Sequence, residues 1–363
     1  MQFARRVFRR FVARKPKEPP PEEPAWAYPD TASIRVYFAN DDFQILIGDG
    51  FEHHWRLLPS LTRRHHFFIT NPWHATEYSF RYSRRCLEYL CPSYPISNVT
   101  WFGNTEEEVR AARQEGWHSI FVNANCWLDE NIYKPDESAG KDRLYDLVIN
   151  CRPENMKRPH LASDIDRLAV IQGICWEPHD YYDLRQLKPV YLNEERLRPQ
   201  QVVSVLNQSV CGGIFSEQEG ACMASSEYLL CGLPVVSTPS RGGRDVWYND
   251  RNSVICAPTS AAVREAVEEI KTGLEIGRFD RIQIREHHVR LAEVMRGRFN
   301  NCVQQIFDRY GVGCDAREYL REVFTNQMFR VIPLADAKRL LNMGADAMQA
   351  QFEIGRAAGT APS

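Results

Sequence analysis

Short apolar runs alternate with amphipathic stretches from about Ala32 to the middle of the chain. The runs are rich in β-branched and aromatic residues and favour strands, whereas the stretches between them have helical spacing. The expected elements are strands at 33–40, 65–70 and 118–125, and helices at 50–61, 75–91 and 104–116. The last helix has a cap-like Asn104 and a glycine stop at Gly116. This alternation predicts an α/β fold.

The alternation continues in the second half of the chain, where it predicts another α/β unit. Its expected strands are 145–151, 211–215, 234–238 and 253–257, and its expected helices are 162–173, 222–231 and 260–273. From 279 to 349 the pattern is almost wholly helical. Within that region one apolar face is predicted to pack as core, and it consists of Tyr319, Leu320, Val323, Phe324 and Met328.

The N-terminus differs from these units. Residues 1–15 have phenylalanines and valines near one helical face and arginines on the others, and a proline-rich spacer follows. Such a segment suits the surface of an anionic membrane, and it suits equally a solvated arm or a helix that docks on a partner protein. The expected division is 1–31 (basic segment and spacer), 32–140 (N-terminal domain), 141–278 (C-terminal domain), 279–349 (helical segment) and 350–363 (tail).

Composition narrows the class of protein. Of 363 residues, 44% are hydrophobic and 25% are charged, which indicates a globular protein with enough apolar material for two cores. The formal net charge of −2 gives no basic field for nucleic acid, and no apolar run approaches the roughly 20 residues of a membrane span. The 11 cysteines lack paired CxxC spacing, and no secretion signal is recognisable. We therefore expect a cytoplasmic protein with reduced thiols, whose membrane contact is at most peripheral.

The stretch "SEQEGACMASSEYLLCGLPVVSTPSRGG" carries a chemical signal. In it, Glu219 and Glu227 bracket a run of very small residues, where a helix is expected to begin after a strand. Small side chains let a ligand approach the backbone, and the free N–H groups of a first helical turn attract phosphate at the carboxyl ends of the strands. The two glutamates are then placed to accept hydrogen bonds from hydroxyls of that ligand, including a ribose diol.

A diphosphate in this crevice needs cations, and two follow the expected strand at 145–151. Arg152 and Lys157 lie in the loop after that strand, five positions apart. An arginine grips phosphate with two parallel hydrogen bonds, and a lysine supplies a compact charge. Either residue alone suits a solvated surface charge. Their occurrence together with the pair Glu219 and Glu227 and with the glycine pair Gly242 and Gly243 indicates a phosphate site.

The segments "EGACMASSE" and "CGLPVVSTPSRGG", together with the Arg152–Lys157 spacing, resemble the C-terminal nucleotide-sugar site of family four of the retaining glycosyltransferases, over roughly 144–267. The resemblance implies the GT-B architecture, in which two Rossmann-like domains face each other and C-terminal helices cross back to brace the first. It also implies that Glu219 contacts hydroxyls of the donor sugar, that Glu227 contacts the ribose, and that Arg152 and Lys157 bind the diphosphate. The other implied donor-site residues are Gly220, Ala221 and Cys222, through their backbone, and the glycine pair Gly242 and Gly243.

The N-terminal half lacks an obvious version of the acceptor-site histidine motif of that family. Its candidate histidines are His54, His74 and His118, each of which also suits local packing or capping, and His74 is the preferred catalytic candidate because it follows an expected strand. Gly50, in "GDG", is expected either to line the cleft or to form a plain turn. Asp41 and Asp42 do not form the spaced Asp-x-Asp of metal-dependent transferases, so no metal is expected.

The implied reaction is the transfer of a hexose, with retention, from a UDP- or GDP-sugar to a hydroxyl of a glycan or lipid-linked acceptor. No cofactor is expected, because Arg152 and Lys157 would stabilise the leaving diphosphate. Two alternatives stay open at this point. A catalytically silent scaffold would keep only the binding site, and a nucleotide-sugar epimerase of the same architecture would carry a richer set of acids in the N-terminal half of the cleft.

Overall fold

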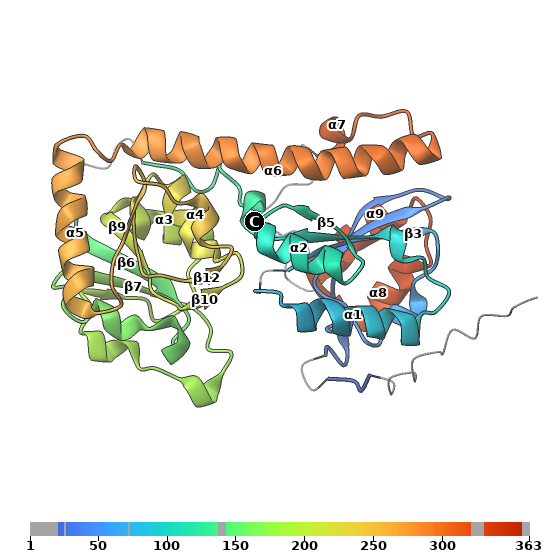
Figure 1. Cartoon of the computed structure of the whole chain (residues 1–363), viewed down its shortest axis with the longest axis horizontal. Helices are drawn as coiled ribbons and strands as arrows, with labels where there is room; N and C mark the ends of the chain where they lie inside the picture. Colours follow the sequence, from blue (N-terminus) through green and yellow to red (C-terminus); the bar gives the residue numbers. More distant parts are fainter. Residues whose placement is uncertain (1–20, 25–26, 72, 137–142, 321–329, 358–363) are drawn as a thin grey trace, which may run out of the picture.

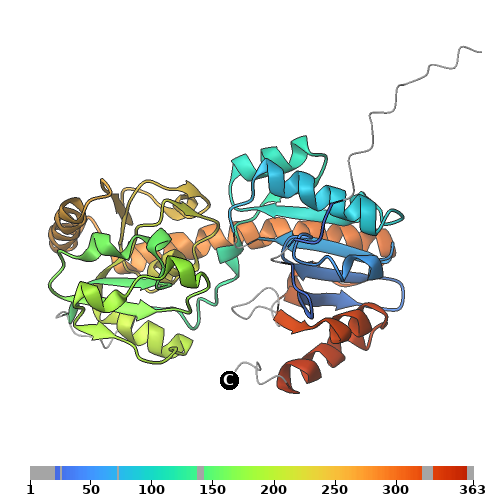
Figure 2. The same cartoon turned by 90° about the horizontal axis from the view of Figure 1, so that it is seen from below.

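The computed structural model describes residues 21–24, 27–71, 73–136, 143–320 and 330–357. Two α/β units lie side by side, and the long helix α6 (Arg281–Tyr310) runs across both of them (Figures 1 and 2). The basic segment 1–15 is outside the described residues. In the part of the chain that is described, no helix combines the length and the apolar character needed to cross a membrane.

The N-terminal unit is built on a six-stranded sheet in the order β14-β1-β2-β3-β4-β5. Its strands are β1 (Thr31–Ala39), β2 (Gln44–Gly48), β3 (His65–Thr70), β4 (Val99–Gly103), β5 (His118–Phe121) and β14 (Arg330–Pro333). Its helices are α1 (Glu77–Leu90), α2 (Glu106–Gln114), α8 (Leu334–Leu341) and α9 (Ala347–Ala357). β1 is antiparallel to both neighbours, whereas β2 to β5 are parallel, so their carboxyl ends share one edge.

The C-terminal unit has a parallel six-stranded sheet in the order β13-β11-β9-β6-β7-β8. Its strands are β6 (Tyr145–Cys151), β7 (Leu168–Gln172), β8 (Tyr191–Leu192), β9 (Ser209–Ile214), β11 (Val235–Ser237) and β13 (Ser253–Ile255), with a small parallel pair β10 (Gln218–Glu219) and β12 (Arg241–Gly242). Its helices are α3 (Pro199–Asn207), α4 (Met223–Leu230) and α5 (Ser260–Glu275). Parallel strands again bring the carboxyl ends of β6 and β9 together at one edge.

Helix α6 braces the N-terminal sheet, as the resemblance implied. It has 30 residues and is therefore about 45 Å long. Phe299, which is fully buried on α6, packs against Tyr37, Phe68 and Phe102 of the N-terminal sheet, with ring centroids 5.2, 5.3 and 5.5 Å away. The short helix α7 (Ala316–Leu320) follows α6 and packs on it. The expectation of bracing C-terminal helices is therefore confirmed.

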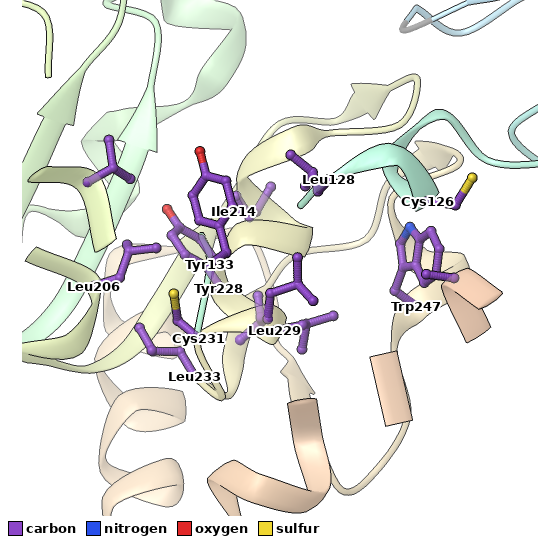
Figure 3. Close-up of a cluster of buried hydrophobic side chains, with 14 of the residues drawn as sticks. Cys126, Leu128, Tyr133, Leu206, Ile214, Tyr228, Leu229, Cys231, Leu233 and Trp247 are labelled. Atoms are coloured by element: carbon purple, nitrogen blue, oxygen red, sulfur yellow. The ribbon is translucent and has the colours of Figure 1, made fainter. Parts of the chain in front are cut away.

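The segment that follows β5 contributes side chains to the core of the C-terminal unit. Cys126, Leu128 and Tyr133 are buried in the same cluster as Tyr228 and Leu229 of α4 (Figure 3). Burial of this much apolar surface is the dominant stabilising term in folding. The same cluster includes Phe68 and Phe102 of the N-terminal sheet, so the chain that links the two sheets packs against both of them.

The helix expected at 162–173 is wrong. Residues 168–172 form strand β7, and only a short 3-10 turn at Pro159–Ala162 precedes it. Leu168, Ala169, Val170 and Ile171 are buried one after another. A parallel strand that is covered on both faces has such a continuous apolar run, and periodicity alone does not distinguish it from a buried helical segment.

Other local expectations are also corrected. The stretch 50–61 is a series of turns with one 3-10 helix at Leu58–Ser60, not a helix. The cap of α2 is Thr105, whose hydroxyl accepts from the Glu108 N–H at 3.0 Å, and not Asn104. Strands β2, β4 and β8 were not expected, and β14 interrupts the region predicted as helical. The side chains of the predicted apolar face, Tyr319, Leu320, Val323, Phe324 and Met328, lie outside the described residues.

Candidate functional site

A cavity of about 280 Å³ opens at the carboxyl edge of β6 and β9, where a doubly wound sheet binds ligands. The loop after β6 contributes Arg152 and Lys157, and the loop after β9 contributes Ser216 and Glu219. The first turns of α4 complete the wall, and the lining residues there are Cys222, Met223, Ala224 and Glu227. The structure thus brings both expected cations and both expected glutamates to one cavity.

Lys157 and Glu219 form an ion pair at the wall of this cavity. The Lys157 ammonium lies 2.5 Å from one Glu219 carboxylate oxygen, and the Ser216 hydroxyl donates to the same oxygen at 2.6 Å. The side chains of Lys157 and Glu219 are 13% and 11% exposed. A charge pair held at the surface of a cavity exchanges partners with an entering anion more readily than a pair in the dry core.

Arg152 is held by groups from both units. Its guanidinium lies 3.1 Å from the fully buried Glu154 carboxylate. It also lies over the rings of Trp176 and Trp73, 5.0 and 5.3 Å from their centroids. Trp73 belongs to the N-terminal unit, so cation–π contacts connect the two sides of the cleft at Arg152. Sequence reasoning found Arg152 but missed these three partners, which lie in loops without a recognisable motif.

Glu227 is buried in the inner wall of the cavity. Tyr133 donates its hydroxyl to one carboxylate oxygen at 2.9 Å, and the Asn150 amide donates to the other at 2.7 Å. Burial raises the pKa of Glu227, while the hydrogen bonds from Tyr133 and Asn150 oppose that rise. Each carboxylate oxygen keeps acceptor capacity for a second hydroxyl. Neither Tyr133 nor Asn150 was expected, although Asn150 is the residue two before Arg152.

The backbone of the small-residue loop is shaped for close approach. Cys222 has a φ of 56°, in the left-handed region, and it precedes α4 without a side-chain cap, so the first N–H groups of that helix have no partner from its side chain. Small residues leave these groups accessible to an anion. Burial raises the pKa of the Cys222 thiol to about 12, so the thiol stays neutral.

Gly242 and Gly243 lie so close to neighbouring atoms that neither position has room for a Cβ atom. Gly242 has a φ of 110°, and a Cβ atom on it would lie 1.6 Å from the backbone oxygen of Glu219. A Cβ on Gly243 would lie 2.5 Å from the Asn104 Cβ of the N-terminal unit. The Gly243 N–H also donates to the backbone oxygen of Gly220 at 2.7 Å. The pair therefore fixes the loop that carries Glu219 and Gly220 and allows the two units to touch.

A buried arginine supports the same loop from behind. The Arg244 guanidinium donates to the backbone oxygen of Ser216 at 3.0 Å and pairs with Asp245 at 2.7 Å. It also donates to the backbone oxygen of Thr238, where β11 ends. Because its side chain is fully buried, Arg244 has a structural role. Nothing in the sequence motif set it apart from a surface arginine.

Among the candidate histidines, only His74 lies at the cleft. A Cβ placed on Gly242 would be 3.5 Å from His74 Nδ1, so the imidazole lies directly beside the glycine pair, although His74 is not among the residues that line the described cavity. Its Nδ1 lies 3.0 Å from the buried Glu108 carboxylate. His118 lies at the start of β5, at the edge of the sheet opposite to its carboxyl ends, and hydrogen-bonds there to Thr100 of β4.

His54 and Gly50 belong to the interior of the N-terminal unit. His54 is buried and contacts the backbone oxygen of Gly50 at 3.1 Å and the Asp49 carboxyl at 3.2 Å. Burial lowers the pKa of His54 to about 4, so its ring stays neutral. A Cβ on Gly50 would lie 2.4 Å from the Glu52 carboxylate, which explains the glycine by packing. Gly50 is not among the residues that line the described cavity.

The described residues contain no group of three or more histidine, cysteine, aspartate or glutamate side chains placed to hold a metal ion. Asp41 and Asp42 lie in the turn between the antiparallel strands β1 and β2, at the start of β2 and hence at the edge opposite the cleft.

No protein-family model matches the sequence, and no curated protein matches it. Solved structures do match. Sucrose-phosphate synthase from Thermosynechococcus elongatus aligns with 13% identity over 73% of this chain and 74% of that chain, with a TM-score of 0.54. Two other solved structures match with lower TM-scores. Anabaena HepE in complex with UDP has 16% identity over 67% of this chain and 73% of that chain, with a TM-score of 0.47. An α,α-trehalose 6-phosphate synthase from Burkholderia multivorans has 11% identity over 74% of this chain and 73% of that chain, with a TM-score of 0.49. The chain has the GT-B fold of two facing Rossmann-like domains.

Proposed function

We propose that the protein is a retaining glycosyltransferase that moves a hexose from a UDP- or GDP-sugar to a hydroxyl acceptor without a bound metal. One observation carries the proposal: Arg152, Lys157, Glu219 and Glu227 line the same cavity at the carboxyl edge of β6 and β9. These side chains supply cations for a diphosphate and carboxylates for sugar hydroxyls. The GT-B fold, seen also in a sucrose-phosphate synthase, is consistent with this chemistry.

The leaving diphosphate is the centre of the proposed mechanism. Arg152, Lys157 and the N-terminus of α4 face the cavity, so positive charge meets the phosphate oxygens as the glycosidic bond breaks. Before the donor binds, Lys157 forms its ion pair with Glu219. A phosphate oxygen that enters beside this pair replaces part of the Glu219 contact, and Glu219 then turns its free acceptor capacity to a hydroxyl of the donor sugar. We do not assign Glu219 as a covalent nucleophile.

The remaining contacts divide between the two units. Glu227, oriented by Tyr133 and Asn150, accepts from the ribose hydroxyls of the donor. The backbone of Gly220, Ala221 and Cys222 approaches the sugar and phosphates. On the opposite side, the Glu108 carboxylate holds a proton on His74 Nδ1 and leaves Nε2 to accept from a hydroxyl in the cleft.

The acceptor is proposed to be a glycan or a lipid-linked sugar at a cytoplasmic membrane surface, and the basis is the basic amphipathic pattern of residues 1–15. Deleting residues 1–24 is expected to abolish sedimentation with vesicles that contain anionic phosphatidylglycerol. Vesicles of neutral phosphatidylcholine are the control. Equal sedimentation of the full chain and the deletion variant would remove the membrane part of the proposal and leave the donor site untouched.

The experiment that tests the function is a titration of the purified protein with UDP, GDP and ADP by calorimetry, in buffer with EDTA. We expect one nucleotide to bind the wild type and to bind Arg152→Ala at least about 10-fold more weakly, since a charged hydrogen bond to phosphate is lost. Arg185→Ala is the matched control, because Arg185 is exposed in the same domain. Absence of binding by all three nucleotides would reject the proposed function.

Sugar conjugates of the nucleotide that binds then identify the reaction. Release of free nucleotide that depends on an added acceptor supports transfer, and the anomeric configuration of the product tests retention. Conversion of the donor to its epimer without an acceptor would indicate an epimerase. Binding without any turnover would indicate a silent scaffold. Each outcome is read from the same incubation by nuclear magnetic resonance.

A further inference from the structure

Two buried asparagines of the N-terminal unit hydrogen-bond to the backbone of the donor loop in the C-terminal unit. The side-chain amide of Asn125 donates to the backbone oxygens of Ala221 and Cys222, at 2.6 and 2.9 Å. The side-chain amide of Asn123 donates to the backbone oxygen of Gly243 at 2.8 Å. Asn123 is 0% exposed and Asn125 is 4% exposed. The contacts are therefore shielded from water.

The two asparagines are themselves held rigidly. The side-chain oxygen of Asn123 accepts from the backbone N–H of Asn125 at 3.0 Å, which caps a short 3-10 helix at Ala124–Trp127. Asn104, at the end of β4, accepts from the Ala124 N–H through its side chain at 3.0 Å. The loop after β5 is thus fixed to the neighbouring strand end before it reaches across the cleft.

The atoms that these asparagines contact lie in the loop that forms the donor cavity. Ala221 and Cys222 immediately precede α4, and Cys222 has the left-handed φ that directs the chain into that helix. Gly243 in turn donates to the backbone oxygen of Gly220. Two of the three bonded carbonyl oxygens, those of Ala221 and Cys222, belong to the run that leads directly into α4, so the hydrogen bonds restrain the backbone at the wall of the cavity.

We propose that Asn123 and Asn125 form an asparagine latch that fixes the donor loop from the opposite domain and links nucleotide affinity to contact between the domains. Both are positioning residues. The identity of the ligand rests on the proposed function, but the geometry of the latch does not. A nucleotide that touches only the C-terminal unit then binds more weakly when an N-terminal side chain is removed.

Chemistry favours amides for this task. An asparagine donates to carbonyl oxygens without adding charge, so the latch leaves the electrostatic field at Arg152 and Lys157 unchanged. Removal of the Asn125 amide takes its hydrogen bonds from the backbone oxygens of Ala221 and Cys222, of which the Cys222 oxygen keeps the Ser225 N–H at 3.1 Å. This loss makes the closed arrangement less favourable and frees the loop. The effect is expected at the loop and not across the fold, because the hydrophobic cores are untouched.

The first measurement is hydrogen exchange by mass spectrometry on peptides that cover 216–226, without nucleotide. In Asn125→Ala, the amides of this loop are expected to exchange at least about 10-fold faster, whereas peptides from β6 stay unchanged. Asn131→Ala is the matched control, since Asn131 is exposed in the same connecting segment. Unchanged exchange in the loop would overturn the latch, whatever the protein binds.

The second measurement is the affinity for the nucleotide that binds the wild type, with UDP as the first probe. Asn125→Ala is expected to weaken binding by about 10-fold. Faster loop exchange without weaker binding would reject the link to the nucleotide. If the wild type binds neither UDP nor GDP, the proposed function fails while the exchange experiment still decides on the latch.

Asn125→Asp separates positioning from simple packing and serves if Asn125→Ala does not fold. An aspartate has the same shape but, when ionised, repels the two carbonyl oxygens. When protonated, its hydroxyl donates to one of them again. Burial beside two carbonyl oxygens raises the pKa of this carboxyl. Relative to the wild type, its affinity is therefore expected to be lowest near about pH 8 and to recover as the pH falls to about 5.5. An equal deficit at both pH values would contradict the proposal.

Discussion

The two sheets present the same kind of edge to the cleft but use it differently. The C-terminal edge places Arg152, Lys157 and Glu219 around an open cavity, where they keep bonding capacity for a ligand. The N-terminal edge carries asparagines and the Glu108–His74 pair, and its polar groups bond to one another and to the facing domain. One edge is built to exchange partners and the other to hold position.

The difference shows that topology alone does not make a binding site. Both edges follow parallel strands, and both begin a helix next to the cleft. What separates them is that the Lys157–Glu219 pair lines an open cavity, whereas Glu108 is buried. At the N-terminal edge, Glu108 is buried and accepts from the N–H groups of Ala75 and Asn104 at 3.1 and 2.7 Å. A carboxylate with that many partners orients its neighbours and has little capacity left for a ligand.

The largest effect is expected at the C-terminal edge. Lys157→Met keeps the apolar stem and removes the charge, so kcat/KM for transfer should fall about 100- to 1,000-fold, as when one donor to a developing anion is lost. Circular dichroism should show a folded protein, because Lys157 lines a cavity and not a core. Lys188→Met, at an exposed lysine of the same domain, should leave kcat/KM unchanged. Equal activity of the two variants would place the phosphate site elsewhere.

A smaller effect of a different kind is expected at the N-terminal edge. Glu108→Leu leaves two backbone N–H groups and His74 without their acceptor, so urea unfolding should show a loss of about 3 kcal/mol. Glu107→Leu, at a neighbouring exposed glutamate of the same helix, should change stability by less than about 0.5 kcal/mol. Similar values for both variants would mean that the edge does not depend on this carboxylate.

The contrast between the edges also explains what sequence could predict. Glu219, Glu227 and the small residues between them lie within one short stretch, and Arg152 and Lys157 lie within another. Their spacing is therefore visible without a structure. The N-terminal network has no such local signature, because the Asn125–Ala221 and Asn123–Gly243 contacts join residues 96 and 120 positions apart.

One strand was predicted wrongly for a related reason. The α/β alternation and the helical pattern after residue 279 were predicted because their periodicity is local, and the bracing by these helices was implied by the resemblance. β7 was predicted as a helix because its continuous apolar run has no period of two, and its pairing with β6 and β8 in a parallel sheet is visible only in the structure. The Glu108–His74 contact likewise has no local signature, because the two residues lie 34 positions apart.

A substitution at Tyr133 tests the hydrogen bond that this residue of the connecting segment donates to Glu227. Tyr133→Phe removes the hydroxyl that donates to the buried carboxylate and keeps the ring in the core, so stability should fall by about 2 kcal/mol. The pKa of Glu227, already raised by burial, should rise further. Urea unfolding measures the first effect, with Tyr181→Phe at an exposed tyrosine as the control. No loss of stability would mean that Glu227 finds another donor.

The smallest effect concerns a titration inside the N-terminal unit. Burial raises the pKa of Asp49 from 3.8 to about 7 and lowers that of the adjacent His54 from 6.5 to about 4. Between about pH 4 and 7 the folded protein keeps a proton on Asp49 that the unfolded chain releases, so this group makes stability fall as pH rises. His54 acts in the opposite direction up to about pH 6.5, because only the unfolded chain binds its proton.

Asp49→Asn removes the fall of stability with rising pH that Asp49 contributes. The stability of the variant relative to the wild type should therefore increase as pH rises from about 4 to 7, by at most about 1.4 kcal/mol per pH unit. Urea unfolding across this range measures the difference, and Asp42→Asn, at an exposed aspartate, should give a flat difference. A flat difference for Asp49→Asn would mean that Asp49 is ionised in the folded protein. The hydrogen bond that Tyr28 donates to Asp49 at 2.9 Å would then be the contact that stabilises this buried charge.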